Sequence, residues 1–117
     1  MGIKYKIWFE KNGKLVFGKG RENILKTMDE LQSLNAAAKE LGMSYRAAWG
    51  RLKASQDRIG MKLIDNSSQT RTMQLTPLAR TIIKHFEKLE KDLNKRIYKA
   101  EQDIEKLINY EEERIPD

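Results

Sequence analysis

The stretch from Leu34 to Lys53, LNAAAKELGMSYRAAWGRLK, most narrows the folds open to this chain. Its first half has three consecutive alanines and ends at Gly42, which predicts a short helix closed by a left-handed turn. Its second half follows Ser44, a residue type that favours the N-cap of a helix. We therefore expect two short helices joined by a tight turn, with Ala38 and Gly42 small enough to let them cross closely.

The second of these helices, residues 45–59, divides into two faces at 100° per residue. The face expected to be buried holds Tyr45, Ala48, Trp49, Leu52 and Ile59. The opposite face, with Arg51 on its flank, holds Arg46, Ala47, Gly50, Lys53 and Ala54. Tyr45 lies at the border, where phosphate contact and core packing are both open, whereas Trp49 is expected to pack inward.

Small and basic residues on one exposed helix face suit the major groove of DNA. Small side chains let the helix axis come close, and arginines reach base edges and phosphates. Glycine in the middle of a helix is less stable than alanine by roughly 1 kcal/mol. The close approach of another surface at Gly50 would offset that loss.

The segments before this pair predict a hairpin and a helix. Residues 3–18, IKYKIWFEKNGKLVFG, alternate apolar and polar side chains, and Asn12-Gly13 favours a two-residue type I′ turn. That turn pairs Phe9 with Val16 and Trp8 with Phe17, which leaves apolar side chains on both faces of the ribbon. Residues 20–32 predict a helix whose inner positions are Ile24, Leu25, Met28 and Leu31.

The segments after the pair predict a second hairpin over residues 62–75 and one long helix. Thr76-Pro77 is a typical helix start, and nothing breaks the pattern before Pro116. About 40 residues would span ~60 Å, too long to be buried by so small a domain. The apolar stripe of this helix consists of Ile82, Phe86, Leu89, Leu93, Ile97, Ala100, Ile104 and Leu107. Self-association explains the stripe better than a membrane surface, because the polar face is net acidic.

In chain order these elements predict a winged helix-turn-helix, mainly α with two small β-hairpins (an α+β fold). Residues 1–75 would be the DNA-binding domain with its N-terminal hairpin, and residues 76–117 a long dimerisation helix. The residues expected at a dimer interface are Trp8, Phe17, Phe86, Leu89, Leu93, Ile97 and Ile104.

Charge supports a polyanionic partner. The net charge is +6, but residues 1–86 carry +9 and residues 87–117 carry −3. A domain this basic attracts nucleic acid through steering and counterion release, although a lysine-rich surface by itself would give the same total. No apolar run is long enough to cross a membrane, and no secretory signal is recognisable at the N-terminus.

The composition also argues against catalysis. The chain has no cysteine and one histidine, His85, so it lacks a nucleophile–base pair and a set of metal ligands. We expect no enzyme activity, no metal and no cofactor. The absence of cysteine is compatible with a reducing, cytoplasmic setting.

The stretch SLNAAAKELGMSYRAAWGRLK resembles the N-terminal DNA-binding domain of the ModE family, the molybdate-responsive transcriptional regulators. The shared pattern is Ser-x-x-x-Ala-Ala-Lys-x-x-Gly-x-Ser-Tyr-x-x-Ala-Trp, and LTPLAR resembles the start of that family's long helix, also met in LysR-type regulators. The resemblance implies that the second helix enters the major groove, that the wing touches the DNA backbone, and that the ribbon and the long helix form a dimer. It further implies DNA contacts by Ser44, Tyr45, Arg46 and Arg51.

Two departures from the ModE pattern limit what carries over. The wing reads NSSQTRT rather than being glycine-rich, which leaves Arg71 as its one expected DNA contact. The sequence ends at Asp117 without the C-terminal molybdate-binding domains, so we expect a stand-alone, one-domain version that binds no molybdate-type oxyanion.

The sequence thus predicts a homodimeric, sequence-specific regulator of transcription that binds double-stranded DNA. Helix 45–59 would lie in the major groove and the wing near residues 65–72 on the backbone. The expected DNA-binding residues are Ser44, Tyr45, Arg46, Ala47, Gly50, Arg51, Lys53 and Arg71. The alternative is a winged-helix module for protein–protein assembly without DNA binding, and a more distant one is a regulator with an effector site at its dimer interface.

Overall fold

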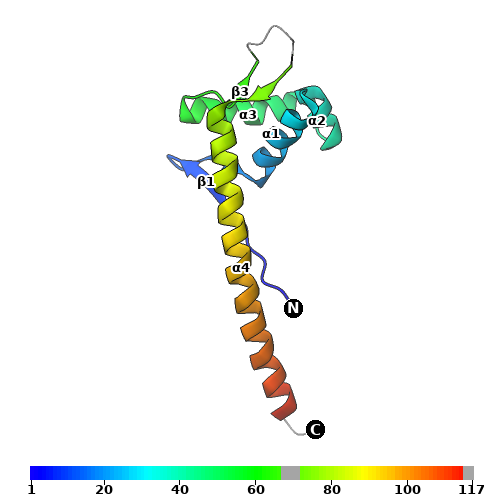
Figure 1. The fold of residues 1–117 in the computed structure, drawn as a ribbon, viewed down its shortest axis with the longest axis vertical. Helices are drawn as coiled ribbons and strands as arrows, with labels where there is room; N and C mark the ends of the chain where they lie inside the picture. The colour runs from blue at the N-terminus through cyan, green and yellow to red at the C-terminus, as the bar shows by residue number, and fades with distance from the viewer. Residues whose placement is uncertain (67–71, 115–117) are drawn as a thin grey trace. The chain divides into compact units, whose positions relative to one another are not determined.

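The computed structural model describes residues 1–66 and 72–114 of the chain (Figure 1). It is mostly helical, with two small antiparallel strand pairs and a long C-terminal helix, as the sequence predicts. Residues 7–83 form one compact unit. A second unit consists of residues 1–6 together with the chain from residue 84 onward.

Three helices make up most of the first unit: α1 (Lys19–Leu31), α2 (Leu34–Glu40) and α3 (Tyr45–Ile59). Their core is formed by Ile24, Leu25, Met28, Leu34, Ala37, Ala38, Ala48 and Leu52. Leu31, expected on the inner face of its helix, is instead exposed, and so is Leu41. Each lies at the end of its helix, where the chain turns before the side chain can reach the core; Gln32, for example, has a φ of 55°.

The first hairpin pairs β1 (Trp8–Lys11) with β2 (Lys14–Gly18) through the expected Asn12-Gly13 turn, whose φ angles are 53° and 76°. The expected register is confirmed next to the turn, where Glu10 lies opposite Leu15, and is wrong from Phe9 backward. A bulge between Phe9 and Glu10 shifts the pairing by one residue, so Phe9 lies opposite Phe17 and Trp8 opposite Gly18.

The hairpin buries only one of its strands. Val16 and Phe17 of β2 are 3% and 2% exposed, whereas Trp8 and Phe9 of β1 are 52% and 60% exposed. Phe17 therefore packs in the core of this chain, and its place at a dimer interface stays a prediction. Trp8 keeps a surface that a second subunit could cover.

The second hairpin is the wing. It pairs β3 (Ile64–Asp65) with β4 (Gln74–Leu75), with Ile64 opposite Leu75. Directly after β4, the backbone N–H of Thr76 donates to the carbonyl of Leu63 at 3.0 Å, which extends the pairing by one hydrogen bond. Leu63, Ile64 and Leu75 are buried and join the wing to the core.

Helix α4 (Pro77–Arg114) starts at the predicted Thr76-Pro77 step. The Thr76 hydroxyl accepts a hydrogen bond from the N–H of Ala79 at 3.2 Å. Within the first unit, Arg80 donates two hydrogen bonds of 2.9 Å to Asp29 of α1, and the same carboxylate accepts the N–H of Leu75 at 3.3 Å. Asp29 thereby connects α1, the wing and the first turn of α4.

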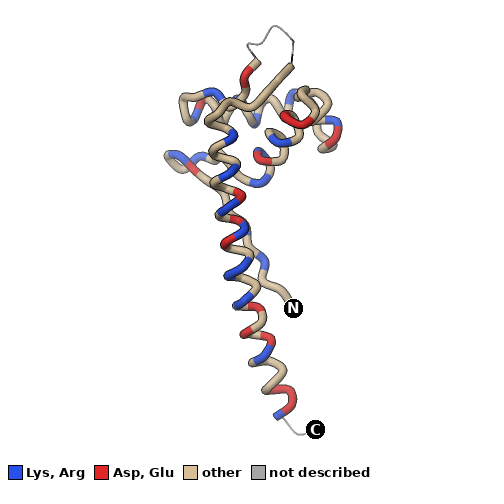
Figure 2. Tube along the Cα trace, in the orientation of Figure 1, with Lys and Arg blue, Asp and Glu red and all other residues tan. Residues whose placement is uncertain are grey.

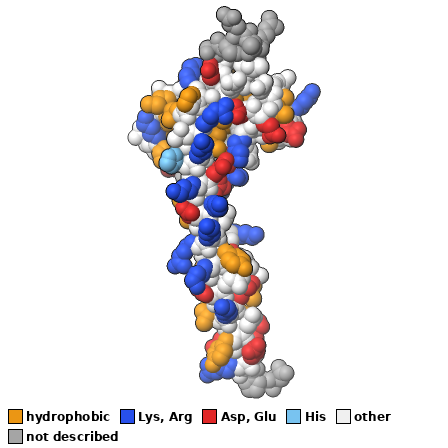
Figure 3. Space-filling view, in the orientation of Figure 1, with side chains coloured by type: hydrophobic (Ala, Val, Ile, Leu, Met, Phe, Trp, Pro, Cys, Tyr) orange, Lys and Arg blue, Asp and Glu red, His pale blue; other side chains and the backbone are white. Residues whose placement is uncertain are grey.

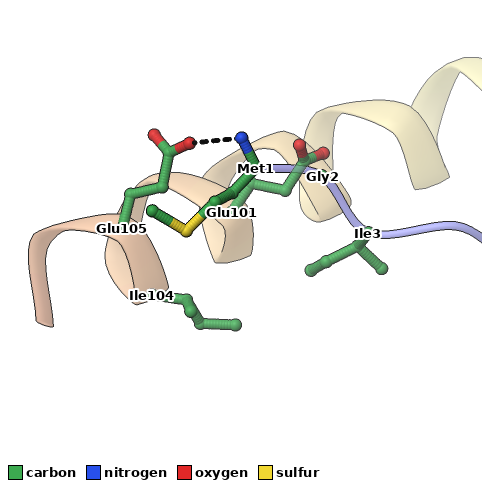
Figure 4. A pocket seen from close by; sticks show the side chains of 6 residues that line it. All are labelled: Met1, Gly2, Ile3, Glu101, Ile104 and Glu105. Atoms are coloured by element: carbon green, nitrogen blue, oxygen red, sulfur yellow. Dashed lines mark ion pairs between the residues drawn. The ribbon is translucent and has the colours of Figure 1, made fainter. Parts of the chain in front are cut away.

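In the second unit, residues 1–6 lie along α4 rather than continuing the hairpin, which corrects the expected strand from Ile3 onward. The Tyr5 hydroxyl donates to the side-chain oxygen of Asn94. The Met1 amino group pairs with Glu105 at 3.3 Å beside a small pocket that Ile3 and Ile104 also line (Figure 4). Of the residues contacted on α4, Ile104 belongs to the apolar stripe that the sequence assigns to self-association, and Asn94 and Glu105 lie beside it in sequence.

The apolar stripe of α4 is only partly covered. Phe86 is buried, and Leu93 and Ile97 are half-buried. The exposed large apolar residues of this helix are Leu89, Tyr98, Ile104, Leu107, Ile108 and Tyr110. In Figure 3 hydrophobic side chains alternate with lysines and arginines along the exposed surface of α4. Phe86 has little surface left for a second subunit, whereas Leu89 and Ile104 remain open.

Candidate nucleic-acid interface

Local hydrogen bonds hold both the start of α2 and the turn between α2 and α3. Ser33 caps α2 by accepting the N–H of Ala36 at 3.1 Å. Gly42 has a φ of 69°, and the N–H of Met43 returns to the carbonyl of Ala38 at 2.9 Å. Because the first residues of α3 follow this turn directly, their direction is fixed by α2.

The N-cap of α3 is Ser44, whose hydroxyl accepts the N–H of Ala47 at 3.0 Å. This capping bond leaves the Ser44 O–H free to donate to a phosphate oxygen, which can only accept. The backbone N–H groups of this first turn point outward from the helix end, where a phosphate is favoured.

The predicted DNA-binding residues of α3 lie on its surface. Arg46, Gly50, Arg51 and Lys53 are exposed, and Ala47 is half-buried. Lys53 pairs with Asp57 one turn later at 2.9 Å, so its charge is partly neutralised. Arg71 lies outside the described residues. Lys and Arg positions recur along the helices of the first unit, α3 among them (Figure 2).

Two aromatic residues of α3 are less buried than their place on the expected inner face predicts. Tyr45 is 45% exposed and belongs to the surface at the start of the helix. Trp49 is half-buried on the flank rather than enclosed in the core. The inward positions are instead completed by Ser55 and Gln56, which sequence reasoning missed because they are polar.

Ser55 and Gln56 are buried because the backbone of neighbouring strands satisfies them. The side-chain oxygen of Gln56 accepts the N–H groups of Leu63 and Ile64, at 2.8 and 3.1 Å. This links α3 directly to the first strand of the wing. The signal was present in the sequence, since position 56 lies one turn after the inward-facing Leu52.

Gly50 has no reason within the chain to be glycine. A Cβ added there would meet nothing within 4 Å, and Gly50 is not among the glycines that have a positive φ. The exposed face of α3 is therefore flat at its centre, between Arg46 and Lys53. That flatness brings the helix backbone within reach of any surface placed against it.

Among residues 1–66 and 72–114, no group of three potential metal-binding side chains is found. In the same part of the chain, no helix is sufficiently long and apolar to cross a membrane.

Comparison with known proteins places these elements in a family of domains. Residues 23–80 match the model of the bacterial regulatory helix-turn-helix protein, lysR family, which describes transcriptional regulators rather than enzymes. The match runs from α1 through the wing into the first turn of α4 and leaves out the N-terminal hairpin. No curated protein is detectably similar to the chain in sequence.

Two solved structures share the fold. VV2_1132, a LysR family transcriptional regulator, is 24% identical, with a TM-score of 0.53 over 64% of this chain. The DNA-binding domain of BenM, solved in complex with catB site 1 DNA, is 16% identical, with a TM-score of 0.55 over 71% of this chain and 90% of its own. This chain spans only 25% of VV2_1132. Residues 23–80 thus form a helix-turn-helix of the LysR type.

Proposed function

We propose that the protein is a sequence-specific, double-stranded-DNA-binding regulator of transcription that acts as a homodimer in the cytoplasm. The observation that carries this proposal is the exposed face of α3, where Arg46 and Arg51 flank a glycine that the fold itself does not require. In this proposal α3 lies in the major groove and the wing contacts the backbone. One helix in each of two adjacent grooves sets the half-sites about one helical turn apart, or a multiple of that.

Three further observations support the proposal. The LysR-type match covers α1 to α4, and the BenM domain of similar fold was solved bound to DNA. The Ser-Tyr-x-x-Ala-Trp motif at Ser44–Trp49 supports a closer, ModE-like relationship of the DNA-binding surface. The apolar residues exposed on α4, together with Trp8, support a second copy as the partner in a dimer.

The first test is binding of the full chain to duplex DNA, using genomic fragments selected by the protein itself. Several phosphate contacts should give an affinity that falls steeply between about 50 and 200 mM salt. Absent binding at low salt, or binding that salt does not change, would contradict the proposal. Retention of a protein partner with no DNA binding would favour the assembly-module alternative.

The second test concerns Arg46. The variant Arg46→Gln should bind the selected site about tenfold or more weakly than the wild type. It should also show a weaker preference for one base at one position of the site, as expected for an arginine that contacts a base. The matched control is Arg96→Gln, which removes the same charge from an exposed position on α4. Equal loss on all sequences would reassign Arg46 to a phosphate contact, and equal loss in the control would remove it from the site.

A further inference from the structure

An arginine cluster, consisting of Arg21, Arg51 and Arg58, lies where α1, α3 and β2 meet. Ser55 of α3 is at the centre: its hydroxyl donates to the carbonyl of Val16 in β2 at 2.6 Å and accepts from Nε of Arg21 in α1 at 2.9 Å. Arg58, one turn along α3, donates to the carbonyl of Leu15. These bonds attach the hairpin to α3 and hold Arg21 and Arg58 in place.

The cluster is not neutralised by carboxylates. Among the residues that the structure describes, no ion pair joins Arg21, Arg51 or Arg58 to an acidic side chain. The acidic residues next to these arginines in sequence form ion pairs with lysines. Glu22 pairs with Lys19 at 3.5 Å and with Lys26 at 3.9 Å, and Asp57 pairs with Lys53.

Burial and two neighbouring arginines all act against the charge of Arg21. Partial burial, then the neighbouring Arg58 and Arg51 guanidiniums, lower the pKa of Arg21 from its ordinary value. An arginine remains charged in spite of such a shift. The folded chain therefore keeps like charges close together, and an anion placed against them would relieve the repulsion.

The turn of the first hairpin extends this positive surface. Lys11, Asn12 and Lys14 of this turn line an open groove, and Asp57 and Arg58 of α3 line the same groove. Both lysines are exposed. Arg51 and Arg58 are seven residues apart, or two helical turns and about 10 Å along α3, so the surface is an elongated ridge.

We propose that this basic ridge, defined as Lys11, Lys14, Arg21, Arg51 and Arg58, binds the phosphate backbone of duplex DNA beside the groove that α3 occupies. The inference rests on the proposed function and adds a second contact, made by a hairpin that lies outside the LysR-type match at residues 23–80. Phosphate is favoured over an acidic protein because the ridge is a row of guanidinium and ammonium donors without an apolar centre.

The test uses the double variant Lys11→Gln/Lys14→Gln in the full chain, because these exposed lysines can be changed without breaking the hydrogen bonds that anchor the hairpin. Each lysine that neutralises a phosphate contributes about 0.9 to the slope of log affinity against log salt. We expect the slope to fall by about 2 and the affinity at 0.1 M salt to fall by about tenfold, equally for all sequences.

The matched control is Lys88→Gln/Lys91→Gln, which removes two charges from exposed positions of α4. It should leave the slope unchanged. A second arm shortens the duplex stepwise from its ends: the difference between wild type and the hairpin variant should disappear once the flanking backbone is removed, while wild-type binding to the central site persists.

The outcomes separate this inference from the proposed function. If the wild type binds no DNA, the proposed function itself fails. If the wild type binds with a steep salt slope and the hairpin variant matches it in slope and affinity, the ridge inference alone is overturned. A variant that keeps its DNA affinity but loses its dimer in a mass measurement would assign the ridge to a subunit contact and would equally overturn it.

Discussion

Gly50 shows how a single residue can report on a partner. In a helix interior, alanine is more stable than glycine by roughly 1 kcal/mol, and here an added Cβ would meet open space. Nothing within the chain therefore opposes alanine at this position. What remains as a reason for glycine is the space that it leaves on the exposed face of α3.

Gly50→Ala should separate stability from binding. We expect the free energy of unfolding in urea to rise by roughly 1 kcal/mol, because the unfolded chain loses freedom. DNA affinity should fall by about tenfold or more, because the methyl group holds the helix away from the groove. Gly20→Ala, in the first turn of α1 and also facing open space, is the matched control and should leave affinity unchanged. Unchanged affinity in Gly50→Ala would contradict the close approach.

Ser55 and Gln56 make a related point about buried polar residues. The Ser55 hydroxyl donates to the carbonyl of Val16, and the side-chain oxygen of Gln56 accepts the N–H groups of Leu63 and Ile64, so both buried oxygens have partners. Ser55 connects α3 to the hairpin, and Gln56 connects it to the wing. The position of both hairpins relative to α3 therefore depends on two adjacent side chains.

At the scale of elements, the start of α3 combines a structural role with a proposed functional one. Ser44 caps the helix through its hydroxyl, and the same turn would face the DNA phosphates. Aspartate and asparagine cap helices about as well as serine does. The two differ in charge, so they distinguish capping from contact with a polyanion.

Ser44→Asp and Ser44→Asn should both retain the thermal stability of the wild type within a few degrees. Only Ser44→Asp should lose DNA affinity, by about tenfold or more at low salt, since its carboxylate would repel the backbone. Melting curves measure the thermal stability of each variant, and binding to the selected duplex measures its DNA affinity. Equal affinity of the two variants would place the start of α3 away from the phosphates.

At the scale of the whole molecule, the described residues leave part of the apolar stripe of α4 exposed to solvent. Leu89 and Ile104 are 48% and 46% exposed, although they lie on the apolar stripe of the helix. Burial of a leucine or isoleucine side chain is worth about 1.5–3 kcal/mol. In a dimer, Leu89 and Ile104 would be buried in both subunits, so the stabilisation from each residue would count twice.

Leu89→Glu/Ile104→Glu should therefore convert a dimer into monomers, with the dissociation constant rising by about a hundredfold or more. Sedimentation at micromolar concentration measures the change, and circular dichroism checks that the helices persist. The matched control, Lys88→Glu/Lys95→Glu, adds the same two carboxylates at exposed positions of α4 that do not belong to its apolar stripe. A wild-type chain that is already monomeric under these conditions would contradict the dimer.

The sequence by itself determined the features that local chemistry controls. Ser33, Ser44 and Thr76 cap helices, and Gly42 and Gly60 adopt positive φ angles at helix ends. Asn12-Gly13 closes the first hairpin. These features depend on hydrogen bonds and backbone angles within a few residues, so the boundaries of α3 and the order of all elements could be predicted.

Tertiary structure alone decided which side chains the elements bury. The bulge after Phe9 moved the strand register by one residue, and packing of β2 against the helices drew Phe17 into the core. Tyr45 remained on the surface, whereas Ser55 was buried by hydrogen bonds to distant backbone. Local patterns give the faces of a helix or strand. Which face is covered depends on partners far away in sequence, and the arginine cluster that unites α1 with α3 beside the hairpin exists only once the chain has folded.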